Sequence, residues 1–280
     1  KKFFFFYYLK NKKKLFKKKN RYNLFNKYLD KKNLDKKILI TTFLYYDDYL
    51  KYEHLLGIYL SKVTKSKIFI LLEQNDKKSR NYFENVGLDN FIFYKKNNIF
   101  YKIKNLILSY KIISKIKNFE DFINFDYKGL PAGKLIYGHH ARYTGIPTTD
   151  FIRVDYYYFL SEFIDYYDQF NEIIDKYKID LIVQSEHQFI PMTVLYGIAL
   201  KKKLTVFLKI GTTDISVKKG YGLDNIFENR YQYDTEIIKK LSIEKKKEDL
   251  KKIGNNYIEE RFLDKNKAIL DVDSERIKLL

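Results

Sequence analysis

The stretch from Lys37 to Leu72, KILITTFLYYDDYLKYEHLLGIYLSKVTKSKIFILL, contains two apolar runs separated by a helical pattern. The runs 37–44 and 67–72 have the composition of strands buried on both faces of a sheet. Between them a single apolar stripe recurs at helical spacing, the side that an amphipathic helix turns toward a core: Tyr52, Leu55, Leu56, Tyr59, Leu60 and Val63. This βαβ unit predicts two parallel strands.

The second half of the chain repeats this organisation. Residues 180–185 and 205–210 are two further apolar runs, and Pro191 leads the helix between them. A long helix precedes this unit, with one continuous stripe: Tyr156, Phe159, Leu160, Phe163, Tyr167, Phe170, Ile174 and Tyr177. The four runs therefore predict four parallel strands in one sheet.

The region between the two units is harder to assign. Residues 91–94 have the composition of a short strand. Residues 99–116 have helical periodicity, with these apolar residues on one side: Ile103, Leu106, Ile107, Tyr110 and Ile113. We therefore expect one more strand and one more helix here, and residues 235–262 also have a helical pattern.

The net charge of +19 is concentrated at the N-terminus, where residues 1–37 hold 14 Lys and one Arg against two Asp. We expect residues 1–36 to be a basic low-complexity tail, either an unstructured arm or a segment that binds an anionic membrane surface. Residues 37–262 form the predicted domain, and 263–280 a linker or the start of another domain. Because the only methionine is Met192, we expect the chain to be a fragment.

Ligands of open parallel sheets bind beyond the carboxyl ends of the strands. His187 follows the third strong strand and is a candidate general base, oriented by Glu186. Gly211 and Thr212 follow the fourth strand and could hold a sugar or phosphate, and Asp47 follows the first. Helix capping and ordinary turns are the competing interpretations for these positions.

Residues 127–150 contain four glycines and two prolines, which indicates special backbone geometry. His139, His140 and Arg142 lie within it and are candidate contacts to an anionic or sugar substrate, with a structural turn as the alternative. Adjacent histidines seldom converge on one ion, and no third ligand has suitable spacing, so no metal site is predicted. With no cysteine, the chain has neither disulfides nor a Cys-based zinc site.

The segments YKGLPAGKLIY (127–137) and RYTG (142–145) resemble bacterial capsule and surface-polysaccharide biosynthesis proteins. The sequences Glu53-His54-Leu55-Leu56 and Ser185-Glu186-His187 are similar as well, so the resemblance extends over about 37–262, although Gly138-His139-His140 departs from the pattern. It implies a Rossmann-like doubly wound parallel α/β sheet, the N-terminal, acceptor-side half of a GT-B glycosyltransferase. The donor-binding half of that architecture would lie outside this chain.

The resemblance further implies transfer of a sugar from a nucleotide-sugar co-substrate to a growing surface polysaccharide, with no bound cofactor. The acceptor would be a sugar or lipid-linked glycan, and the place of action the cytoplasm, at the inner face of the cell membrane. A non-catalytic partner-binding component of capsule assembly is an alternative. A basic nucleic-acid binder is another, but the charge is terminal and no recognition motif is present, so no specific nucleic acid is expected.

Overall fold

The computed structural model describes residues 36–43, 47–95, 99–145, 151–210 and 216–227, with a few helical positions near 251–255. The chain divides into two compact units, residues 1–209 with 217–226, and residues 210–216 with 227–280. Nearly all described residues belong to the first unit. The predicted tail, apart from Lys36, and the predicted segment 263–280 lie outside the described residues.

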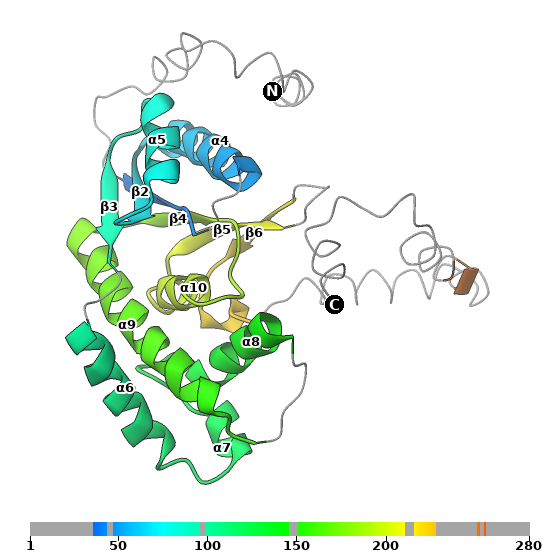
Figure 1. Ribbon diagram of the computed structural model, residues 1–280. Helices are drawn as coiled ribbons and strands as arrows, with labels where there is room; N and C mark the ends of the chain where they lie inside the picture. The colour runs from blue at the N-terminus through cyan, green and yellow to red at the C-terminus, as the bar shows by residue number, and fades with distance from the viewer. Residues whose placement is uncertain are drawn as a thin grey trace, which may run out of the picture. The chain divides into compact units, whose positions relative to one another are not determined.

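The first unit is an α/β fold (Figure 1). Its strands are β1 (Lys36–Thr41), β2 (Ser66–Glu73), β3 (Phe91–Tyr94), β4 (Leu181–Gln184), β5 (Thr205–Ile210) and β6 (Ser216–Gly220). Its helices are α4 (Asp47–Thr64), α5 (Lys77–Asn85), α6 (Ile99–Ile113), α7 (Phe119–Ile123), α8 (Ala132–Thr144), α9 (Val154–Tyr177) and α10 (Met192–Lys201), with a 3₁₀ turn η1 (Leu223–Asn225).

The sheet has the order β3-β2-β1-β4-β5-β6. The pairs β1–β2, β1–β4, β2–β3 and β4–β5 are parallel, which confirms the predicted parallel sheet. This is the strand order of the doubly wound Rossmann fold, in which the chain moves outward from β1 in one direction and then from β4 in the other. The point where the order reverses, the topological switch point, lies between β1 and β4.

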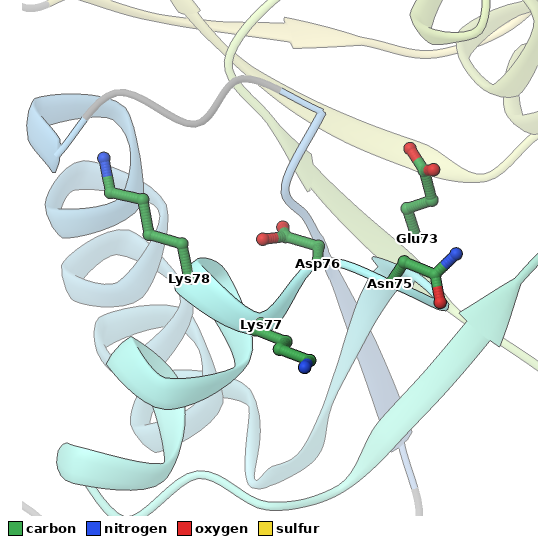
Figure 2. Close-up of a pocket in the computed structure, with 5 residues that line it drawn as sticks. All are labelled: Glu73, Asn75, Asp76, Lys77 and Lys78. Atoms are coloured by element: carbon green, nitrogen blue, oxygen red, sulfur yellow. The ribbon is translucent and has the colours of Figure 1, made fainter.

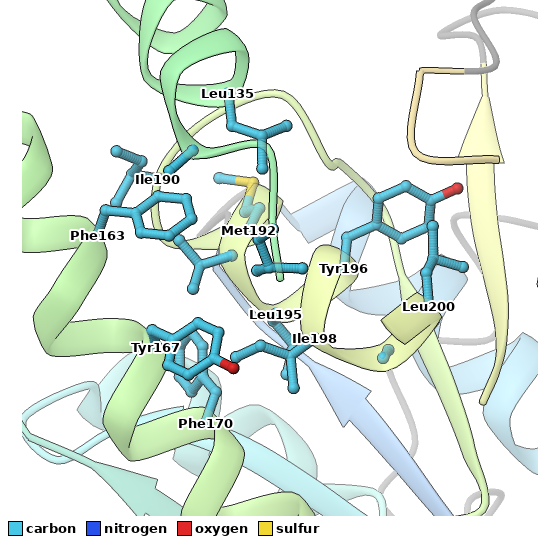
Figure 3. Close-up of a cluster of buried hydrophobic side chains, with 14 of the residues drawn as sticks. Leu135, Phe163, Tyr167, Phe170, Ile190, Met192, Leu195, Tyr196, Ile198 and Leu200 are labelled. Atoms are coloured by element: carbon cyan, nitrogen blue, oxygen red, sulfur yellow. The ribbon is translucent and has the colours of Figure 1, made fainter. Parts of the chain in front are cut away.

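The centre of the sheet is buried because each of its faces is covered by helices. Ile38 and Ile40 point into a core that α4 and α5 complete. Leu39 points into a larger core formed with α8, α9 and α10. Figure 1 shows these two groups of helices on opposite sides of the sheet. In Figure 3, α10 lies between the strands and α9, with Leu195 and Ile198 toward the aromatic side chains of α9.

The predicted stripe of α9 is confirmed. Seven of its eight members are buried, among them Tyr156, Phe163 and Phe170, which are fully so, and Tyr177 is half-buried against the same core. The apolar residues of α10 are buried as well, and Pro191 stands at its N-cap as expected for a helix-leading proline.

The predicted orientation of α4 is confirmed only in part: Tyr52 and Leu60 of the predicted stripe are buried, and Leu56 is partly buried against the core on this face. Tyr59 and Val63 are 64% and 63% exposed, whereas His54, Gly57 and Ser61 face inward. Gly57 lies so close to β1 that a Cβ atom there would be 2.3 Å from Ile40 Cδ1. The small residues allow α4 to approach the sheet more closely than the larger apolar side chains would permit.

The glycine-rich segment is helical over Ala132–Thr144, which corrects the alternative of a structural turn at His139 and His140. Both belong to α8, which ends at Gly145 in the left-handed conformation favoured by glycine. Special geometry is nevertheless present at Gly133, where a Cβ atom would lie 1.7 Å from the Phe122 carbonyl oxygen. Glycine is therefore needed for the close contact between α7 and α8.

Candidate functional site

The carboxyl ends of β1 and β4 meet at the switch point, the place where open α/β sheets bind ligands. The hydroxyls that end β1 are used within the sheet: Thr41 donates to the Val183 carbonyl at 3.3 Å, and Thr42 to the Leu71 carbonyl at 3.0 Å. These bonds hold the end of β1 against both neighbouring strands. The chemically distinctive groups here come from α4, β5 and the turn that follows β4.

Glu53 is the least expected of these groups. It projects from α4 toward Ser185 and is only 1% exposed. Burial raises the pKa of its carboxyl well above the usual range, although Ser185 and Lys209 favour the charged form. Within the described residues its Oε2 atom accepts no hydrogen bond. A carboxyl group of this kind keeps its proton to higher pH than an ordinary glutamate.

Lys209 supplies the positive charge near Glu53. It interrupts the apolar pattern of β5 and is only 7% exposed. Its Nζ atom lies 3.8 Å from the ring centroid of Tyr49 and 5.8 Å from that of Tyr52, which places the ammonium group over aromatic faces. Burial, with Glu53 as a second cause, raises the pKa of Tyr52. The group is therefore a compact buried network of acid, lysine and tyrosines.

The turn after β4 is organised by Glu186. Its Oε1 atom accepts from the backbone N–H groups of His187 at 2.8 Å and Gln188 at 3.1 Å. The same oxygen lies 3.8 Å from His187 Nδ1. The His187 ring packs edge-on against Tyr196, with centroids 5.1 Å apart. With 14% of its side chain exposed, His187 is held in place and still reaches solvent.

His139 connects α8 to this turn. Its Nδ1 atom accepts a hydrogen bond from the Ile190 N–H at 3.2 Å, and its ring packs against Phe159 and Phe189. Burial, and secondarily His140, lowers the pKa of His139 to about 4, so the ring is neutral at pH 7. His139 therefore joins α8 to the segment that follows β4 through a buried contact within the protein.

His140 and Arg142 differ from each other. His140 is fully buried beside Tyr156, with its Nε2 atom 3.4 Å from Asp155 Oδ2. Burial and then Arg153 lower its pKa, which Asp155 partly counters. Arg142 is exposed near the end of α8. Both histidines are buried inside the domain, which corrects the prediction that they contact a substrate. The Arg142 side chain, in contrast, is accessible to solvent.

The other predicted positions are not described. Gly211 and Thr212 lie outside the described residues, and Asp47 begins α4 but its side chain is not described either. Glu53 and Lys209 were missed as site members by the sequence analysis. The available signals were an acidic residue beside the apolar stripe of a helix, and a lysine inside an otherwise apolar strand.

A pocket of about 350 Å³ opens at the carboxyl end of β2 (Figure 2). It is lined by Glu73, Asn75, Asp76, Lys77 and Lys78. Asp76 Oδ1 accepts from the Ser79 N–H at 3.0 Å and so caps α5. The other lining residues include one carboxylate, Glu73, and two lysines, Lys77 and Lys78, so the pocket is polar and contains charges of both signs.

Among the described residues, no group of three or more His, Asp or Glu side chains is arranged to hold a metal ion. No helix within the described ranges combines the length and apolar character needed to cross a membrane.

No protein-family model matches the chain, and no curated protein matches it. Among solved structures, it is similar to the structure of a CDPS from Fluoribacter dumoffii, with 13% sequence identity over 67% of this chain and 92% of that chain. The TM-score is 0.35, and we draw no conclusion about activity from a similarity of this level.

Proposed function

We propose that this chain is the acceptor-side domain of a GT-B-type glycosyltransferase that moves a sugar from a nucleotide-sugar to a growing surface polysaccharide. The resemblance of residues 127–145 to capsule-biosynthesis proteins motivates the proposal. The observation that carries it is the arrangement at the switch point, where Glu53, Lys209 and the Ser185–His187 turn meet beside the strand ends that ligands use.

His187 is the proposed general base. Deprotonation of an acceptor hydroxyl at neutral pH needs a group whose pKa lies near 7, and imidazole satisfies this. Glu186 holds the His187 backbone and lies beside its ring, so it positions the base. Glu53 is too deeply buried to contact an acceptor. Its proposed role is to hold Ser185, the first residue after β4, in position.

The substrate would then occupy the edge of the sheet beside this turn. Arg142 is the exposed cation that the capsule-like motif contributes, and it suits a phosphate of a lipid-linked acceptor. The nucleotide-sugar would be held by the donor-binding half of the architecture and enters as a co-substrate. No bound cofactor is proposed.

The test is turnover by the complete natural polypeptide that contains this chain. Release of nucleoside diphosphate is measured with a panel of nucleotide-sugars and lipid-linked oligosaccharide acceptors. His187→Ala should lower turnover by about 10²–10⁴-fold while the melting temperature stays close to that of the wild type. Tyr59→Ala, at an exposed position on α4, serves as the matched control and should retain wild-type turnover.

Two outcomes contradict the proposal. Wild-type turnover in His187→Ala would exclude this residue as the base. Glycan binding without release of nucleoside diphosphate from any donor would instead support a non-catalytic component of capsule assembly.

A further inference from the structure

The outer surface of α6 is the most apolar exposed region that the structure describes. Among all the residues that the structure describes, 18 large hydrophobic residues are exposed, and eight of these lie on α6. They are Ile99, Phe100, Tyr101, Ile103, Leu106, Ile107, Leu108 and Tyr110. The side predicted from periodicity is thus turned outward, with Ile113 as its buried exception.

The inner side of α6 is correspondingly polar. Asn105 and Ser109 are buried, and the Ser109 hydroxyl contacts the Tyr157 carbonyl oxygen of α9 at 2.8 Å. Figure 1 shows α6 on the outer side of α9, away from the sheet. A helix that packs through Asn and Ser while exposing Phe, Ile and Leu reverses the usual arrangement of a surface helix.

The exposed ridge is continuous along the helix. Phe100, Ile103, Ile107 and Tyr110 follow helical spacing and are 78%, 49%, 51% and 62% exposed. The Tyr110 ring lies 5.9 Å from that of Tyr157, which extends the surface toward α9. There Val154 and Tyr158 are also exposed, at 84% and 57%. We call these residues, with the rest of the exposed face of α6, the α6 surface.

Along α6 and its flanking residues the charge has one sign, whereas Asp155 and Glu162 stand beside the part of the surface that α9 contributes. Residues 95–119 contain seven lysines and neither aspartate nor glutamate. Lys102, Lys104 and Lys111 lie on α6 itself and are exposed. Apolar side chains flanked by lysines are typical of helices that lie in the interface of an anionic bilayer, where the lysines meet lipid phosphates.

We propose that the α6 surface docks this domain onto an anionic lipid bilayer, with α6 parallel to the membrane plane. A helix of this length covers about 22 Å of the interface. A second copy is a poorer occupant, because a two-fold pairing of α6 with itself would bring lysines together without carboxylates from this helix to compensate. The inference does not depend on the proposed enzymatic activity, and it rests on residues other than those of the basic tail 1–36.

Vesicle sedimentation at about 0.15 M salt tests the docking, since surface electrostatics are screened but not abolished there. The full chain is mixed with phosphatidylcholine vesicles containing phosphatidylglycerol and, separately, with phosphatidylcholine alone. The triple variant Phe100→Ser, Ile103→Ser, Ile107→Ser should bind the anionic vesicles at least about tenfold more weakly, because three apolar side chains no longer insert. The matched control Tyr59→Ser, Val63→Ser removes similarly exposed apolar residues from α4 and should bind like the wild type.

A second readout separates insertion of α6 from attraction by the tail, which every variant retains. The chain has no tryptophan, so Ile107→Trp introduces a single tryptophan at the α6 surface, which is excited selectively at wavelengths where tyrosine absorbs little. Its emission should shift to the blue and be quenched by brominated lipids, whereas Tyr59→Trp should not be quenched. Absence of quenching for Ile107→Trp overturns the proposal, however well the protein sediments with vesicles. A dimer that the triple variant abolishes, with no quenching, would assign the surface to a second copy.

Discussion

The helices on the two faces of the sheet bury different sets of side chains. On one face α9 buries large aromatic residues such as Phe163 and Phe170. On the other, α4 buries aliphatic residues such as Ile58 and Leu60, but it also turns Gly57, Ser61 and His54 inward and leaves Tyr59 exposed. The difference teaches that apolar periodicity predicts the orientation of a helix that packs through large residues. It fails where small residues allow a closer contact.

The largest expected effect comes from the aromatic face. Phe163→Ala should reduce the free energy of unfolding by about 3–5 kcal/mol, because it leaves a cavity in the core around α9. Tyr59→Ala on α4 should change it by less than about 0.5 kcal/mol, since that side chain is exposed. Urea denaturation measures both. A comparable loss for Tyr59→Ala would mean that α4 faces the sheet with its apolar stripe.

A pH-dependent effect follows from the buried histidine of the α4 face. Burial lowers the pKa of His54 to about 4, so the folded protein keeps it neutral while the unfolded chain protonates it below about 6.5. The unfolded state then binds more protons, and stability falls as the pH decreases from about 6.5 toward 4.

Comparison of the wild type with His54→Gln isolates this effect, because the opposite contribution of Glu53 is present in both proteins. Between pH 6.5 and 4.5 the wild type should lose about 2–3 kcal/mol more than the variant. His139→Gln should behave in the same way, since burial lowers the pKa of His139 to about 4 as well. Parallel pH profiles for wild type and variant would place His54 in contact with water.

A smaller effect is expected from filling the close contact of α4. Gly57→Leu should destabilise the fold by about 1–3 kcal/mol, because the added side chain overlaps Ile40 and the helix must move away from β1. The control Gly138→Leu, at a helical glycine of α8 whose added Cβ would meet nothing within 4 Å, should cause no such loss. Equal thermal melting of wild type and Gly57→Leu would show that α4 and β1 are not in close contact.

The candidate site was predictable in part. Strand order locates the carboxyl edge, and the motif around Ser185 indicates a turn there, so His187 and Glu186 could be named from their positions after β4. Glu53 could not be assigned, because its role depends on Ser185 and Lys209, which are more than 130 residues away in the chain. His139 was expected to face substrate, yet its ring is occupied by the Ile190 N–H.

Local composition and spacing were sufficient to predict the parallel sheet, five of its strands, and the helices α4, α6, α9 and α10, because residues close in the chain carry those signals. Which side of α4 and α6 is buried depends on partners distant in sequence. Ile40 leaves no space for a side chain at Gly57, and the Tyr157 carbonyl oxygen accepts a hydrogen bond from the Ser109 hydroxyl. Packing distance and the satisfaction of polar groups are properties of the assembled fold, so burial at these positions emerges only after the elements have come together.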